Sequence, residues 1–462
     1  MKSSHLDRRG FLAGSFASVP LIGTMMAAGP HQPIDVPALK GSRNSVVIPT
    51  HEFAGNIYER LDFPADWKVE VREMAGHDAP VLTEQQIAAK LAQPIGTKSL
   101  RELAAGKQRV VITFDDLTRP TPTFAVAPWV IGELKAAGVP DEGILFLGSF
   151  GTHRAMTVTE IQQKLGPEIA RRYAWTNHNP FDNLKDVGET SFKNPVRINQ
   201  TFMAADLRIC LSGIKVHGQA GYGGGAKGIL PGIAGITTIA YNHEVVLGNT
   251  RTARPGWVFK NEMRLDMEEA ARLAKVDFTV QMLYNQKLQP TAVFSGDIVD
   301  AHHAGVRVAV KHYCTKTFKD PEIIVSSSYP QCREADHAQR WISRSIREGG
   351  TGVQIVQHPL GTDTVHYLHN GEAGRGGASY FDVAARQLAR PLGGKGAPGN
   401  IAQIVYSQYT DRTQMNFYPR GTQFCNKWAD VIRILQERHK GTVQVAVYPY
   451  GGLQHEELEL DE

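Results

Sequence analysis

Residues 213–243 read GIKVHGQAGYGGGAKGILPGIAGITTIAYNH and combine a dense glycine cluster with two histidines and a lysine. The apolar run before them, at residues 207–214, predicts a buried strand. Glycines at this density allow positive φ values and a close approach of the backbone to a ligand. A helix opening near Lys227 would add unpaired N–H groups suited to an anion. The stretch therefore predicts a ligand-binding turn between a strand and a helix.

A phosphate-binding P-loop is one interpretation of the glycine cluster. That motif needs a glycine before its lysine and a serine or threonine after it. Here Ala226 precedes Lys227 and Gly228 follows it, so the motif fails at two positions. A turn without chemistry is the other simple interpretation, and the flanking His217 and His243 argue against it.

The chain has 462 residues, which is enough for two or three domains with cores of their own. Its formal net charge of +4 indicates neither a nucleic-acid partner nor a stable membrane association. The four cysteines are scattered without a C-x-x-C pair, which excludes a cysteine zinc site of the usual spacing. A disulfide between Cys314 and Cys332 stays an open alternative.

The first thirty residues are typical of an export signal and not of a folded domain. The segment from Asp7 to Leu12 reads DRRGFL and resembles the twin-arginine signal, and an apolar run diluted by glycine and serine ends near Ala28. A membrane anchor is the alternative, but about 18 residues that include Pro20 make a poor span. We therefore expect a signal peptide at residues 1–30, export by the twin-arginine machinery and a periplasmic mature protein.

The rest of the chain alternates predicted strands and helices, the pattern of an α/β fold. We expect a linker at residues 31–45, a catalytic and cofactor-binding domain at 46–286, a second α/β domain at 287–445 and a C-terminal segment at 446–462. The active site is expected in the cleft between the two domains. The clearest predicted strands are 67–71, 109–114, 143–148, 207–214, 276–283, 322–328, 349–356, 402–407 and 443–448, and the clearest predicted helices are 83–91, 128–137 and the segment from 244 to 274.

Several polar side chains follow predicted strands directly. Ligands of open α/β sheets gather at the carboxyl ends of the strands, so these side chains are expected to converge on one crevice. They are Asp116, Arg119, His153, His217 and Lys227.

Three separated motifs resemble those of the lactate racemase family. The segment AGYGGGAK at 220–227 lies between His217 and His243 at the spacings that the family shows. Upstream, DDLTRPTP at 115–122 is of the family's D-x-T-R-P type, and GTHRAMT at 151–157 is of its G-x-H-R-x-M-T type. The three motifs also follow the family's order along the chain.

This resemblance covers roughly residues 44–455 and implies an isomerase, a racemase or epimerase of 2-hydroxy acids. Family members carry a nickel-pincer nucleotide, Ni(II) pyridinium-3,5-bisthiocarboxylic acid mononucleotide, whose ring takes up and returns hydride. By resemblance, Lys227 attaches this cofactor covalently and His243 binds the nickel, a metal that imidazole suits. The proteins that synthesise the cofactor are implied partners. The remaining cofactor-binding candidates are Gly223, Gly224, Gly225 and Asp116.

The resemblance also implies two bases, one for each enantiomer of the substrate. His153 and His217 match the family's pair, and an imidazole that titrates near neutrality suits proton transfer. Arg119 is the candidate for the substrate carboxylate, because its planar fork pairs bidentately. Asp116 is placed to orient either Arg119 or a catalytic histidine.

One departure from the family lies in the second domain. After a Tyr-Pro pair the family has a glutamine and, three residues later, a lysine, whereas this chain has His337 and Arg340. A cation remains at the second position, so both residues are predicted to bind substrate. The more polar lining favours a larger substrate than lactate, either hydroxylated or dicarboxylic, such as a sugar acid. Among the other histidines, six are expected to be structural because they match no motif: His178, His302, His303, His358, His366 and His369.

Two functions of other classes stay open from the sequence. One is an exported protein that binds nickel or another ligand with a degenerate active site. The other is a phosphate-ester enzyme that uses Lys227 and Arg119 as an anion clamp. The four intact residues His153, His217, Lys227 and His243 argue against the first, and the lack of an acidic magnesium motif argues against the second.

Overall fold

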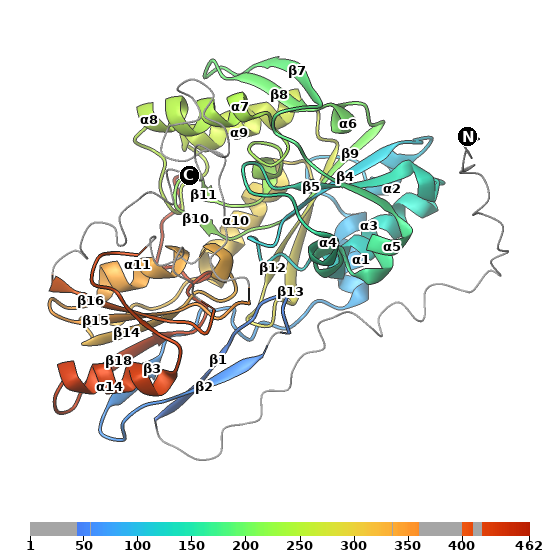
Figure 1. The fold of residues 1–462 in the computed structure, drawn as a ribbon. Coiled ribbons are helices and arrows are strands. Elements are labelled where there is room, and N and C mark those ends of the chain that lie inside the picture. Colours follow the sequence, from blue (N-terminus) through green and yellow to red (C-terminus); the bar gives the residue numbers. More distant parts are fainter. Residues whose placement is uncertain (1–43, 56, 335, 360–399, 410–417) are drawn as a thin grey trace, which may run out of the picture.

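The computed structural model describes residues 44–55, 57–334, 336–359, 400–409 and 418–462. Two six-stranded sheets, each with its own helices, dominate this part of the chain (Figure 1). The predicted α/β class is confirmed. The predicted signal peptide, the linker up to residue 43, His366 and His369 lie outside the described residues.

The first sheet holds the strands that lead into the predicted site. Five of its strands run parallel, and the edge strand β13 pairs antiparallel with β12. A short hairpin of β10 (Val216–His217) with β11 (Gly221–Tyr222) follows the central strand β9. In spatial order the sheet consists of β13 (Pro290–Gly296), β12 (Phe278–Tyr284), β9 (Leu207–Gly213), β4 (Val110–Asp115), β5 (Ile144–Ser149) and β6 (Ala174–Asn177).

The second sheet is parallel throughout. Its spatial order is β17 (Gln423–Cys425), β16 (Ala402–Tyr406), β15 (Thr351–Ile355), β14 (Ile323–Ser327), β18 (Gln444–Tyr448) and β3 (Lys68–Val71). Two antiparallel pairs lie outside both large sheets: β1 (Ser45–Pro49) with β2 (Tyr58–Asp62), and β7 (Leu184–Glu189) with β8 (Pro195–Asn199).

Helices cover both faces of the first sheet. Alternate residues of β9 show this, because Ile209 packs into one core cluster with α3, while Cys210 packs into another with α9. Burial on both faces explains why its strands read as continuous apolar runs. The helices of this part are α1 (Glu84–Ala92), α2 (Leu100–Ala104), α3 (Thr123–Ala136), α4 (Val158–Leu165), α5 (Pro167–Arg172), α6 (Gln200–Met203), α9 (Glu262–Leu273) and α10 (Asp300–His312). Helices α11 (Asp336–Ser345) and α14 (Trp428–Arg438) pack on the second sheet.

Local sequence signals gave most of these elements correctly. Helix α1 begins after Thr83, close to the predicted start, and the Thr83 side chain forms a capping box with Gln86. The helix expected from 244 to 274 is interrupted: the chain is helical up to Asn249, residues 250–261 are not helical, and α9 fills most of the rest. Pro255 and Gly256, with a φ of 86° at the glycine, interrupt it, and Asn261 caps the new start.

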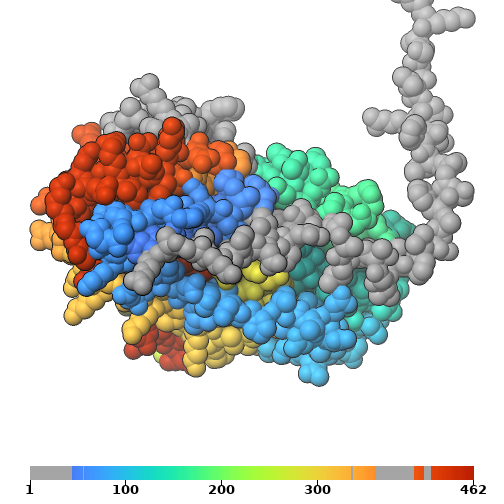
Figure 2. Space-filling view, turned by 90° about the horizontal axis from the view of Figure 1, so that it is seen from below, coloured from blue at the N-terminus to red at the C-terminus, as the bar shows by residue number. Residues whose placement is uncertain are grey.

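The sheets do not divide the chain at residue 286 as predicted. Strand β13 and helix α10 lie beyond that point yet pack on β12 of the first sheet. Strand β3 precedes that point by more than two hundred residues yet pairs with β18 of the second sheet. Figure 2 shows the early residues, in blue, lying against both the red C-terminal part and the green middle part. The chain therefore passes to the second sheet only after α10.

The C-terminal segment also differs from the prediction. Its first residues, up to Tyr448, belong to β18 of the second sheet, while Tyr450 and Leu453 pack into a core cluster of the first. All four cysteines are free thiols, so the Cys314–Cys332 disulfide is not formed. Among the described residues, no helix is both long enough and apolar enough to cross a membrane.

Candidate active site

The glycine stretch leaves the carboxyl end of β9 and folds back on it. Gly224 and Gly225 have φ values of 80° and 57°, which favour glycine. A Cβ on Gly224 would lie 2.8 Å from the carbonyl oxygen of Gly213, and one on Gly225 would lie 2.8 Å from the His302 ring. A Cβ on Gly223 would meet nothing closer than 3.6 Å. The close approach therefore requires glycine at the second and third positions of the cluster.

Lys227 lies in a short 3-10 helix, η2 (Gly225–Gly228), and not at the start of a longer helix as predicted. This single turn offers no helix N-terminus for a phosphate, so that part of the prediction is wrong. The partly buried Lys227 side chain has its pKa lowered to about 7, first by burial and then by the charges of Arg119 and Arg264. A large share of Lys227 is thus an uncharged amine near neutral pH, the form that attacks electrophiles.

His243 lies in a π-helical turn, η3 (Tyr241–Val246), between α7 (Ile236–Ala240) and α8 (Leu247–Asn249). Its Nδ1 is 3.0 Å from the carbonyl oxygen of Ile239, so Nδ1–H donates and the lone pair of Nε2 is left for a metal. Burial and then the Lys227 charge lower its pKa to about 4, which keeps the ring neutral. Both features are those of a metal-binding imidazole.

A buried carboxylate fixes the π-helical turn. Asp266 accepts hydrogen bonds from the Asn242 amide at 2.7 Å, from Asn194 at 2.8 Å and from the Thr190 hydroxyl at 2.6 Å. Asn242 directly precedes His243, so this network ties the histidine to α9. No sequence motif indicated this hydrogen-bond network, because its members lie far apart along the chain.

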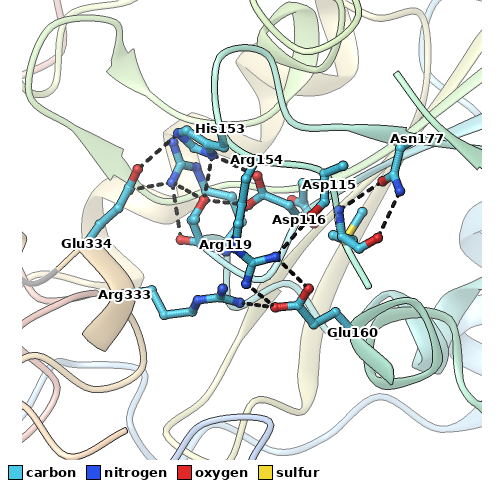
Figure 3. Close-up of polar contacts among 12 residues, drawn as sticks. Asp115, Asp116, Arg119, His153, Arg154, Glu160, Asn177, Arg333 and Glu334 are labelled. Carbon is cyan, nitrogen blue, oxygen red and sulfur yellow. Dashed lines mark hydrogen bonds and ion pairs between the residues drawn. The ribbon is translucent and has the colours of Figure 1, made fainter. Parts of the chain in front are cut away.

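His153 lies between two carboxylates. Its Nδ1 is 2.7 Å from Asp116 Oδ2, and its Nε2 is 3.3 Å from Glu334 Oε1 (Figure 3). Burial alone would lower the pKa of His153, but Asp116 and Glu334 raise it to about 9. Burial alone would raise the pKa of Asp116, but His153, Arg119 and the Thr118 hydroxyl together lower it. The two predicted residues thus form a charged pair in which Asp116 orients the ring.

Arg119 extends this group toward the second sheet. Its Nη1 is 2.5 Å from Glu334 Oε2 and donates to the Thr118 hydroxyl at 2.9 Å. Figure 3 shows Glu334 reaching from its own segment toward both Arg119 and His153. Glu334 belongs to η4 (Cys332–Glu334), which follows β14. The predicted convergence of Asp116, Arg119 and His153 is therefore present in this structure.

His217 differs from His153 in its protonation. Its Nδ1 accepts hydrogen bonds from the backbone N–H groups of Gln219 and Ala220, at 3.2 and 3.1 Å. Burial, followed by the charges of Lys227 and Arg119, lowers the pKa of His217 well below its usual value. The ring is therefore neutral with its proton on Nε2, and it acts as a donor toward the site in this conformation.

His337 and Arg340, the two predicted substrate-binding residues of the second domain, contact different parts of the structure. His337 Nε2 lies 3.4 Å from Glu334 Oε2, and the His337 and His217 rings are 6.4 Å apart between centroids. Arg340 instead donates to the carbonyl oxygen of Gln454 in the C-terminal segment. His337 thus belongs to the group around Glu334, and Arg340 lies beside a different element.

Sequence reasoning missed three buried residues of this site. Glu334 is the first, and its partners Gln331 and Lys215 are the others. Gln331 donates to Glu334 at 2.7 Å and accepts from the buried Lys215 ammonium. Lys215 was recognisable, because it precedes His217 by two residues in the glycine stretch. Glu334 and Gln331 could not be identified from the sequence, because they join the site only through the long-range contact of their segment with the first sheet.

The remaining described histidines make structural contacts, as expected. His178 Nε2 contacts the carbonyl oxygen of Ala234 at 2.9 Å, and His358 Nε2 contacts that of Glu52 at 3.1 Å. His302 and His303 lie with Glu268 close enough to share an ion, with donor atoms within 4.8 Å of one another. The Arg264 guanidinium contacts both His302 and Glu268, and its positive charge disfavours a cation there.

Comparison with known proteins agrees with this geometry. The family description "Lactate racemase N-terminal domain" matches residues 54–254. The lactate racemase of Lactiplantibacillus plantarum is 32% identical over 297 residues, which cover 63% of this chain and 70% of that protein. The lactate racemase of Thermoanaerobacterium thermosaccharolyticum is 30% identical over 265 residues, which cover 56% of this chain and 62% of that protein.

Two solved structures have the same fold. The lactate racemase apoprotein from Thermoanaerobacterium thermosaccharolyticum matches with a TM-score of 0.65 at 21% identity, over 90% of this chain and all of that one. A structural-genomics protein from Thermotoga maritima matches with a TM-score of 0.59 at 18% identity, over 82% of this chain and 99% of that one. The relatives identify an enzyme of the isomerase class, a racemase. The chain belongs to the lactate racemase family.

Proposed function

We propose that this enzyme is a racemase or epimerase of 2-hydroxy acids that works by reversible hydride transfer to a nickel-pincer nucleotide, with Lys227 as the covalent attachment point and His243 as the nickel ligand. One observation supports it above the others: Lys227 lies close enough to lower the pKa of both His217 and His243. The amine, the metal-type imidazole and a candidate base are thus parts of one electrostatic group. Lactate itself is the substrate named for the relatives, and the polar His337 favours a larger acid here.

The residues present fit such a group. Lys227 is partly an uncharged amine near pH 7, as covalent attachment requires. His243 has its Nε2 lone pair left for nickel. When bound, the cofactor would supply the electrophilic carbon that takes hydride from C2 of the substrate and returns it.

The chain's own residues then handle the charge and the protons. Arg119 holds the substrate carboxylate through its planar fork. His153, oriented by Asp116, and His217 exchange the hydroxyl proton on either side of C2. In the substrate-free protein His153 carries a proton and His217 carries no charge. The pair therefore begins with a charged His153 and a neutral His217 that carries its proton on Nε2, so His217 must move that proton to Nδ1 before it can act as a base.

The function is tested by interconversion of pure enantiomers with protein made together with the cofactor-synthesis proteins. Chiral chromatography of lactate and of polyhydroxy acids gives the rate. Racemisation or epimerisation at C2 is expected, and its absence with all these acids would remove the proposal. A phosphate-ester enzyme is less favoured, because no acidic magnesium-binding motif accompanies Lys227 and Arg119 in the sequence.

The pH dependence of kcat/KM follows from the two histidines. Activity needs one of them protonated, so kcat/KM is expected to fall above about pH 9, where His153 loses its proton. The acid limb should lie well below pH 6.5, because the pKa of His217 is lowered. In Asp116→Asn the alkaline limb should move to lower pH, since the carboxylate that raises the His153 pKa is gone. An alkaline limb that does not move in this variant would contradict the assignment.

We further propose export by the twin-arginine route to the periplasm, because that route carries proteins that fold and take up a cofactor before export. The support is the DRRGFL segment at residues 7–12. Changing Arg8 and Arg9 together to lysine is expected to retain the protein inside the cell. Fractionation of cells and immunoblotting measure this, and unchanged recovery from the periplasm would exclude the route. A mature N-terminus near residues 28–31 is expected in the wild type.

A further inference from the structure

We propose that Glu334 determines which 2-hydroxy acids the enzyme accepts, admitting monocarboxylates with a neutral or hydroxylated chain and rejecting acids with a second carboxylate. The inference rests on the proposed function and narrows its substrate class. It also revises the expectation from sequence, which left hydroxylated and dicarboxylic acids equally open.

Glu334 is a fixed part of the site wall. Its side chain is 9% exposed, and four side chains contact it: Arg119, His153, Gln331 and His337. Gln331 cannot turn its amide around without loss, because its oxygen accepts from Lys215 while its nitrogen donates to Glu334. A carboxylate held in this way presents a negative charge at a constant place.

The Arg119 guanidinium has hydrogen-bond acceptors on Nη1, while its Nε–Nη2 edge, here called the open edge, faces none among the described residues. Nη1 donates to Glu334 and to Thr118. Among the described residues none accepts a hydrogen bond from Nε or Nη2 of Arg119. These two atoms form the edge of the fork that pairs bidentately with a carboxylate. The substrate carboxylate is therefore expected on this open edge, with Glu334 on the same guanidinium.

The charges around this position leave room for one anion. In the contact group, Arg119 and His153 are matched by Asp116 and Glu334. Lys215, which contacts Gln331, adds one further positive charge. Lys227 lies near the same group, but once attached to the cofactor it would carry no charge. One substrate carboxylate then balances Lys215, and a second one on the same small molecule would face Glu334 at low dielectric.

Glu334 favours a hydroxyl group on the substrate chain, although it repels a second carboxylate. A hydroxyl donates to a carboxylate in a charge-assisted hydrogen bond, so a chain hydroxyl near Glu334 is favourable. His337 beside it offers a further polar partner. The site thus distinguishes two polar substituents of similar size by charge and not by volume.

The test uses Glu334→Gln, which keeps the shape and removes the charge. For the holoenzyme, kcat/KM is measured with lactate, glycerate and malate, and binding of the same acids to the cofactor-free protein is measured by calorimetry. The wild type is expected to prefer lactate and glycerate over malate by at least about tenfold, because like charges brought together are strongly unfavourable. In Glu334→Gln this preference should shrink by about tenfold or more.

Glu133→Gln is the matched control, since Glu133 also pairs with an arginine but lies on α3 at the surface. It should leave the preference unchanged. A wild type that uses malate as well as lactate, or a Glu334→Gln variant with the wild-type preference, overturns the inference. If the variant does not fold, the wild-type preference decides. If no 2-hydroxy acid is interconverted at all, the proposed function fails, and the calorimetric comparison of lactate with malate still decides the role of Glu334.

Discussion

Replacing Lys227 by alanine is expected to remove bound nickel and to lower the racemisation rate by at least about a thousandfold, as loss of an entire catalytic group does. The physical reason is that the pKa of Lys227 is lowered to about 7, whereas an unshifted lysine is almost fully protonated at that pH. Alanine offers no nucleophile for attachment. The measurements are intact-protein mass, nickel content by elemental analysis and enantiomer interconversion.

Two further variants make this result specific. Lys227→Arg keeps a positive charge but has no amine that loses its proton near neutrality, so it should also lack the covalent mass. Lys311→Ala, at an exposed position in the last turn of α10, should retain mass, nickel and activity. A Lys227→Ala protein that retained wild-type nickel and activity would show that attachment does not occur through this residue. An unchanged melting temperature in all three variants would show that loss of the cofactor is not caused by unfolding.

The sequence predicted the parts of the fold that depend on local signals. Thr83 with Gln86 marked a helix start, and the apolar run at 207–214 marked the central strand. Sheet membership could not be predicted in the same way, because β3 pairs with β18 across most of the chain. Such a pairing depends on the packing of distant segments, and periodicity within a short window contains no information on it.

The site could also be predicted only in part from the sequence. Asp116, His153 and Arg119 were identified and do lie together, since each follows a strand of the first sheet. Glu334 was not identified, because an isolated glutamate in a polar segment carries no signal until η4 is placed against the first sheet. Arg340 was chosen for its charge, and it lies instead against the carbonyl oxygen of Gln454.

The two histidines are expected to serve opposite enantiomers. If His153 and His217 are bases on opposite sides of C2, each accepts the hydroxyl proton of one enantiomer and returns it to the other. His153→Ala and His217→Ala should therefore each abolish full interconversion. Each should still react once with one enantiomer, and the two variants should prefer opposite ones. Single-turnover absorbance of the holoenzyme with each pure enantiomer measures this, and His77→Ala, at a partly exposed ion pair, is the control.

The hydrogen bonds of His217 make this experiment decisive. With Nδ1 accepting from Gln219 and Ala220, the neutral ring has its proton on Nε2 and can donate but not accept there. To act as a base, His217 must release these two backbone groups and move its proton to Nδ1, a change confined to one short turn. His153 needs no change of tautomer, because Asp116 already holds the Nδ1 proton, but it must lose its Nε2 proton before it acts as a base. Opposite enantiomer preferences would show that the turn opens during catalysis. Equal loss of both enantiomers in His217→Ala would instead make His217 a permanent donor and His153 the one base of the pair.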